Sequence, residues 1–126
     1  MNLKPITINE DKSNKLYTSA VCQQVLSIYD DFYSKIGFNI PWIGYFVLKE
    51  NQILGSCSFV GPPQNGKVEI AYWTFKEFER QGVASFACKK LVSIAKQTDP
   101  NLEITAKTAL EHNASTKILA NNNFVF

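Results

Sequence analysis

The chain has 126 residues, of which 45% are apolar and 19% charged, and this length suits one globular domain over residues 1–126. Thirteen basic and eleven acidic residues leave a net charge of +2, which is too balanced to favour nucleic acid or an anionic membrane as a partner. Three widely spaced cysteines without a CxxC pair argue against a disulfide framework or a metal site. The cysteine pattern instead predicts buried free thiols. Because the sequence also shows no signal-peptide core after Met1 and no apolar run that could span a bilayer, we expect a cytoplasmic protein.

The first predicted element is a helix over residues 13–36. Ser13 or Asn14 can cap its start, and Gly37 can end it. Its apolar residues recur at spacings of three and four and form one broad stripe. These residues are Leu16, Tyr17, Ala20, Val21, Val25, Ile28, Tyr29, Phe32 and Tyr33.

Three strands are predicted next, because β-branched and aromatic residues dominate residues 42–48, 53–60 and 67–74. Glu50–Asn51 lies between the first two, and so short a turn predicts an antiparallel hairpin. Glycines and prolines mark residues 61–66 as a loop before the third strand.

The apolar period then changes to that of a helix from residue 82 to about residue 98, where Asp99–Pro100 stops it. A short strand over residues 102–106, a short helix over 114–121 and the start of a last strand at 124–126 follow. The order predicts a mixed α/β fold, with an antiparallel meander first and a crossover helix second.

Residues 61–67 read GxxxxGK, the first part of a phosphate-binding P-loop. Val68 stands where that motif needs Ser or Thr, and Pro62 and Pro63 have no N–H to offer a phosphate. A strand rather than a helix is predicted to follow. We therefore reject a P-loop.

Residues 68–85 read as a strand, a short loop and a helix with small first residues. Gly82 and Ala84 allow a ligand close to the backbone, and the free N–H groups of a helix start favour an anion. Arg80, the only arginine, can grip a phosphate at two points. The residues alone fit two interpretations equally, a phosphate site or a turn with small packing residues.

This stretch resembles the signature motif of the GNAT N-acetyltransferases, where an Arg/Gln-x-x-Gly-x-Gly/Ala loop opens the helix that cradles the pyrophosphate of acetyl-CoA. Gly82 and Ala84 match the small positions, whereas Glu79 occupies the Arg/Gln position. The resemblance implies the acyl-CoA N-acyltransferase fold with three α/β/α layers and acetyl-CoA as cosubstrate. The implied backbone contacts are Trp73, Thr74 and Phe75 for the pantetheine and oxyanion, and Arg80, Gln81, Gly82, Val83, Ala84 and Ser85 for the pyrophosphate.

The resemblance extends to both sides of this motif. Gly61–Pro62–Pro63 before the third strand is similar to a branch close to the enzymes that acetylate ribosomal protein N-termini. Residues 111–119 resemble the Glu-Asn-x-x-Ser segment that opens the last helix of the family, and Phe124 falls where that helix ends in Gly-Phe. The family's helix-opening Asn aligns with His112 or Asn113, which adds both to the implied cosubstrate contacts.

The resemblance implies direct attack of a primary amine on the thioester, which needs a base. Glu69 is the candidate, because the histone-acetylating branch places its glutamate four residues before the position of Trp73. The alternative is a solvated glutamate on a half-exposed strand. Leu119 or Ala120 stands where many members carry a tyrosine acid, and His112 is either its substitute or a cap or surface residue.

The acceptor amine is open, because the fold builds its pocket from the first helix and variable loops, here residues 30–42 and 60–67. Asp30 and Asp31 either attract a cationic amine or form a solvated helix end. Glu79 and the missing tyrosine leave a weakly catalytic acyl-CoA-binding module as an alternative, and an interaction protein of the same fold is the other. Since family members continue past the strand that begins at Phe124, we also expect a homodimer or a partner chain to complete the C-terminal sheet edge.

Overall fold

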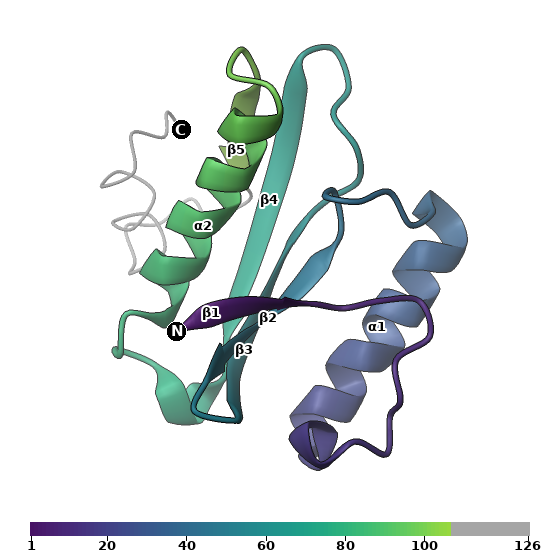
Figure 1. Ribbon diagram of the computed structural model, residues 1–126, viewed down its shortest axis with the longest axis vertical. Helices are drawn as coiled ribbons and strands as arrows, with labels where there is room; N and C mark the ends of the chain where they lie inside the picture. Colours follow the sequence, from purple (N-terminus) through teal and green to yellow (C-terminus); the bar gives the residue numbers. More distant parts are fainter. Residues whose placement is uncertain (107–126) are drawn as a thin grey trace.

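The computed structural model describes residues 1–106, which form one five-stranded sheet and two long helices (Figure 1). The elements in chain order are β1 (Asn2–Pro5), the 3-10 turn η1 (Lys15–Tyr17), α1 (Ala20–Ile36), β2 (Gly44–Lys49), β3 (Gln52–Phe59), β4 (Lys67–Thr74), the 3-10 turn η2 (Lys76–Phe78), α2 (Val83–Thr98) and β5 (Glu103–Ala106).

The strands lie in the order β1-β2-β3-β4-β5. Each of the first four pairs antiparallel with its neighbour, and β5 pairs parallel with β4 after the crossover through α2. This topology confirms the mixed α/β fold class, with a meander first and a crossover helix second.

Two tight turns lie in the meander: Glu50–Asn51 joins β2 directly to β3, and Asn65–Gly66 joins Gln64 to Lys67 at the start of β4. Glu50 and Asn51 have φ angles of 51° and 62°, and Asn65 and Gly66 have φ angles of 53° and 74°. Consecutive positive φ values are those of the two-residue turns whose twist matches antiparallel strands. Because a strand follows the second turn, the structure agrees with the rejection of a P-loop.

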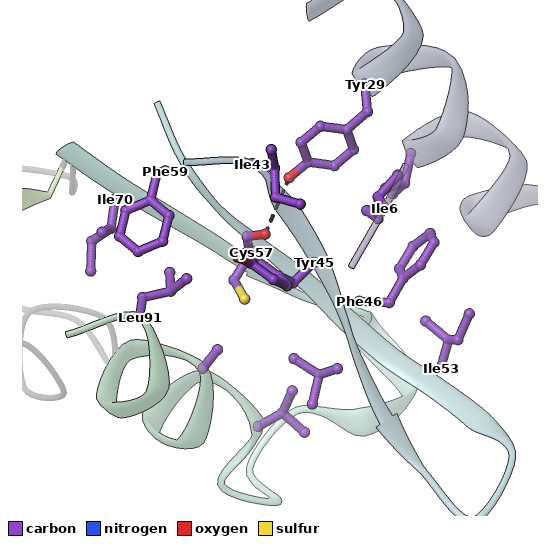
Figure 2. Close-up of a cluster of buried hydrophobic side chains, with 14 of the residues drawn as sticks. Ile6, Tyr29, Ile43, Tyr45, Phe46, Ile53, Cys57, Phe59, Ile70 and Leu91 are labelled. Atoms are coloured by element: carbon purple, nitrogen blue, oxygen red, sulfur yellow. Dashed lines mark hydrogen bonds between the residues drawn. The ribbon is translucent and has the colours of Figure 1, made fainter. Parts of the chain in front are cut away.

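The two helices cover opposite faces of the sheet (Figure 2). The Tyr29 hydroxyl of α1 hydrogen-bonds the Cys57 carbonyl of β3 from one side. The Cys57 side chain points to the other side, toward α2, which contributes the buried Cys88. The fully buried Phe59, Ile70 and Leu91 continue the α2 side of the core. This arrangement confirms the three layers.

The predicted helix over residues 13–36 is wrong in its first third. Asn14 caps only the turn η1, where its side chain accepts from the N–H of Leu16. Ser19 then caps α1 by accepting from the N–H of Cys22. Gly37, with φ 97°, ends α1 as predicted.

The sequence analysis missed β1. This strand of four residues pairs with β2, from Asn2 opposite Leu48 to Pro5 opposite Tyr45. Proline at its end is tolerated because β1 lies at the edge of the sheet.

The predicted helix over residues 114–121 and strand at 124–126 lie outside the described residues, as do His112, Asn113, Leu119 and Ala120. None of the helices within residues 1–106 has the length and hydropathy needed to cross a bilayer.

Candidate active site

The turn from β4 into α2 exposes the start of α2. Arg80 has φ 64° and Gly82 φ 79°, so two left-handed residues within three positions reverse the chain. Within residues 1–106, a Cβ added at Gly82 would meet no atom within 4 Å, so this glycine supplies a backbone conformation beside space that the described residues leave open.

The first turn of α2 offers N–H groups to that space. Gly82 is the N-cap of α2, and no side chain of the described residues caps the helix. Ser85 is exposed and Ala84 half-buried, whereas the Val83 side chain is buried. An uncapped helix start with a small N-cap residue is a site for an anion.

Charges of both signs surround this helix start. Arg80 and Gln81 are exposed, and so are Glu77 and Glu79. Within residues 1–106 Arg80 forms no ion pair, so its guanidinium remains available to an anionic ligand. Glu79 is exposed, so its carboxylate is screened by water.

The hydrogen-bond pattern between β3 and β4 decides which main-chain groups face a ligand. The N–H of Phe75 donates to the Leu54 carbonyl at 3.0 Å, so it is occupied. At the other end of the ladder, the N–H of Val60 donates to the Glu69 carbonyl at 2.8 Å. Because bonded pairs alternate along an antiparallel ladder, Trp73 also turns its main-chain groups toward β3.

The same alternation turns the main-chain groups of Thr74 toward the opposite edge of β4. β5 pairs with β4 only from Lys67 to Ile70. In the described part of the chain, therefore, no strand lies beside Thr74 on that edge. Of the three predicted strand contacts, Thr74 is the one whose N–H points to an open edge leading to the start of α2.

Glu69 lies in the middle of β4 and is half-buried. Strand alternation places its side chain on the α1 face, with Ala71 and Trp73. Within residues 1–106 its carboxylate has no hydrogen-bond or ion-pair partner. Such a carboxylate can accept a proton from a ligand on that face.

A cavity of about 310 Å³ opens between α1 and the sheet on this same face. Its lining is almost wholly apolar and comes from α1, β3 and β4. The described lining residues are Val25, Ile28, Tyr29, Phe32, Ser56, Cys57, Ser58, Val60, Ala71, Tyr72 and Trp73.

The two acidic residues considered for the acceptor pocket do not line this cavity. Asp30 pairs with Lys12, and Asp31 pairs with Lys35 at 3.1 Å. Both carboxylates are about half exposed or more, so the structure favours a solvated helix end.

All three cysteines are buried and free, which confirms the predicted thiols. Burial raises the pKa of the Cys88 thiol to about 11 and raises that of Cys57 further. Both thiols are therefore protonated at neutral pH and lack the thiolate that a nucleophile needs. Among residues 1–106, no three His, Cys, Asp or Glu side chains gather as metal ligands.

The structure thus places Glu69, Trp73 and Thr74 on one strand, β4, with Glu69 and Trp73 on the α1 face, and places residues 80–85 at the start of α2. The cavity residues of β3 were missed. Their signal is a serine on each side of Cys57 in an otherwise apolar strand, since alternation directs Ser56 and Ser58 to one face.

Comparison with known proteins agrees with this geometry. Residues 5–125 match the family model of the acetyltransferase (GNAT) domain. The uncharacterized N-acetyltransferase YjdG of Bacillus subtilis (strain 168) is 34% identical over 91 residues, which are 71% of this chain and 52% of that protein. The chain thus spans about half the length of this curated relative.

Solved structures show the same fold. The N-acetyltransferase PseH of Campylobacter jejuni, in complex with acetyl coenzyme A, superimposes with a TM-score of 0.66 at 13% identity, covering 98% of this chain and 87% of that one. The ribosomal L7/L12 alpha-N-protein acetyltransferase RimL, in complex with coenzyme A, gives 0.61 at 20% identity, covering 86% and 60%. The chain belongs to the GNAT acetyltransferase family.

Proposed function

We propose that this chain, as one domain over residues 1–126, transfers an acetyl group from acetyl-CoA to a primary amine. The carrying observation is the uncapped start of α2 beside open space at Gly82, with Arg80 next to it, in a member of the GNAT family. Relatives of the same fold are solved with acetyl coenzyme A and coenzyme A.

The residues present fit this cosubstrate. The N–H groups of residues 83–85 and the Arg80 guanidinium would hold the pyrophosphate. The N–H of Thr74, on the open edge of β4, would hold the pantetheine arm or the carbonyl oxygen that gains charge during attack.

Glu69 is the proposed base. A primary amine is mostly protonated at neutral pH, since the reference pKa of an alkylammonium is about 10.4. Glu69, directly or through a water molecule, takes one proton from the ammonium, and the neutral nitrogen then forms its bond to the acetyl carbon. The carbon–sulfur bond breaks, the nitrogen gives its second proton to the departing thiolate of coenzyme A through solvent, and Glu69 releases the first proton to solvent.

A titration of acetyl-CoA into the purified protein tests the cosubstrate site, with desulfo-CoA and ADP as companion ligands. We expect micromolar binding that Gly82→Trp weakens by more than about tenfold, because the indole fills the space beside the helix start. Gly66→Trp is the matched control, since Gly66 also has a positive φ, of 74°, and open space around it, but lies in the β3–β4 turn.

Two results would contradict the proposal. One is an absence of binding at millimolar acetyl-CoA, and the other is an equal loss of affinity in both tryptophan variants. Binding without transfer to any amine would instead favour the acyl-CoA-binding module.

The buried free thiols support the expected reducing, cytoplasmic environment. A homodimer remains our proposal for the assembly.

A further inference from the structure

The cavity between α1 and the sheet has a chemistry that selects among amines. At about 310 Å³ it lies at the small end of the range of ligand pockets, so it accommodates one compact group. Tyr29 of α1 lines one side, and Ser56, Ser58 and Ala71 of the sheet line the other.

The polar groups of this cavity are neutral and already paired. Burial raises the pKa of the Tyr29 hydroxyl, although hydrogen bonds with Ser58 and Ser56 lower it in part. The same hydroxyl lies 3.5 Å from the Cys57 carbonyl (Figure 2). No charged side chain of residues 1–106 lines the cavity. An ammonium or guanidinium group inside it would lose its hydration without gaining a counter-charge.

The mouth of the cavity is also apolar. Ile28 and Trp73 are 51% and 43% exposed, Val60 is 43% exposed, and all three line this cavity. An apolar ligand group would remove their surfaces from water. The cavity and its mouth therefore both favour an uncharged hydrocarbon group.

The position of Glu69 connects this cavity to the proposed reaction. Val60 is its ladder neighbour, since the Val60 N–H donates to the Glu69 carbonyl at 2.8 Å. Ala71 follows Glu69 by two residues on the same face, which corresponds to about 7 Å along a strand. A ligand with its hydrocarbon group in the cavity thus has its amine within reach of the carboxylate.

We propose that the acceptor is a primary amine that carries a compact, uncharged hydrocarbon group, aromatic or branched aliphatic, and that this group occupies the cavity. Polyamines and aminoglycosides, with further charges next to the reacting amine, are disfavoured. The inference rests on the proposed acetyl transfer and adds the class of acceptor to it.

The first test compares 2-phenylethylamine and 3-methylbutylamine with 1,4-diaminobutane as acceptors, by the release of the coenzyme A thiol. We expect kcat/KM to be at least about tenfold higher for the two hydrocarbon amines, which corresponds to about 1.4 kcal/mol in the transition state. Equal or higher kcat/KM for the diamine would overturn the inference while leaving acetyl transfer established.

The second test places a charge at the mouth of the cavity. Val60→Asp should lower the ratio of the affinities for 2-phenylethylamine and 1,4-diaminobutane, both measured by calorimetry without acetyl-CoA. The added carboxylate removes apolar surface at the mouth and attracts the two ammonium groups of the diamine more strongly than the single one of 2-phenylethylamine. Ile40→Asp is the matched control, because Ile40 is 73% exposed and does not line the cavity. The Ile40→Asp variant should bind both amines with the same affinities as the unchanged protein.

The calorimetry separates failure of the inference from failure of the proposed function. If 2-phenylethylamine binds more tightly than 1,4-diaminobutane and Val60→Asp lowers that preference, but no amine is acetylated, the cavity chemistry stands and acetyl transfer falls. If 2-phenylethylamine binds no better than 1,4-diaminobutane, or if the preference is the same in both aspartate variants, the inference is overturned whatever the turnover.

Discussion

At the scale of single residues, Glu69 is the side chain that we propose as the general base. Replacing it by glutamine keeps the shape and removes the base. We expect Glu69→Gln to lower kcat by at least about 100-fold, the usual contribution of general base catalysis, with little change in acetyl-CoA affinity. Steady-state kinetics with 2-phenylethylamine, alongside an acetyl-CoA titration, checks both quantities.

Glu103→Gln serves as the control for this substitution. Glu103 is an exposed glutamate on the adjacent strand β5, 3.7 Å from Lys67, so it shares the strand environment without facing the cavity. Its kcat should be unchanged. A similar loss of activity in both variants, or a full kcat in Glu69→Gln, would remove Glu69 from the mechanism and leave it the solvated strand residue of the alternative interpretation.

The sequence predicts the helix-start residues of the site better than the cavity. Gly82 and Arg80 belong to a local segment, and a strand–turn–helix pattern places their backbone without any long-range contact. The cavity instead needs Tyr29 of α1 to meet Ser56 and Ser58 of β3, about thirty residues apart, and spacing alone does not show which faces of the two elements meet.

At the scale of elements, one charged network fastens the segment after β1 to η1. Lys4 donates to Tyr17 at 2.7 Å and pairs with Glu10 at 3.3 Å, and Glu10 also accepts from Thr7. Partial burial would raise the pKa of Glu10, but the hydrogen bonds from Thr7 and Tyr17 and the charge of Lys4 lower it to about 2.

This shift predicts acid lability. The pKa of Glu10 is lower in the folded chain than its ordinary value of 4.5, so its stabilisation is present above pH 4.5 and is lost as the pH falls toward 2. We expect the loss to be roughly 2 kcal/mol, less than the full pKa shift implies because Lys4 is partly exposed. Urea unfolding at several pH values between about 5 and about 2 measures this loss of unfolding free energy, because the ordinary and the folded pKa of Glu10 lie within that range.

Glu10→Gln should make the free energy of unfolding depend less on pH between about 5 and about 2. Glu50→Gln, in the exposed β2–β3 turn, should leave that dependence unchanged. A steep acid loss that persists in Glu10→Gln would assign the lability to other carboxylates.

The break between η1 and α1 and the strand β1 were not predicted because neither changes the spacing of apolar residues in the sequence. The apolar stripe of the first helix runs through Leu16 and Tyr17, because a 3-10 turn keeps nearly the same spacing as an α-helix, so periodicity does not reveal the break. Only Ser19, a second capping residue, marks it. β1 forms by pairing with β2, and its four residues are too few to show an alternation of their own.

At the scale of the whole molecule, the order of helix-period and strand-period segments was enough to predict a mixed α/β fold with a meander and a crossover helix, and the family resemblance implied its three layers. What the order leaves open is how α1 is joined to the sheet. In the structure a buried tyrosine joins them: the Tyr33 hydroxyl donates to the Ile6 carbonyl at 2.7 Å and accepts from the Gly44 N–H at 2.9 Å. One side chain of α1 thus satisfies main-chain groups of two other segments.

Tyr33→Phe should therefore cost more stability than the loss of a single hydrogen bond. The substitution leaves a buried N–H and a buried carbonyl without their partner, which we expect to lower the free energy of unfolding by about 2–3 kcal/mol. Tyr45→Phe is the control, because the Tyr45 hydroxyl donates to one carbonyl only, that of Pro41 at 2.8 Å. Its cost should be about 1 kcal/mol. Urea unfolding at neutral pH measures both, and equal costs would show that Tyr33 is not the main connection between α1 and the sheet.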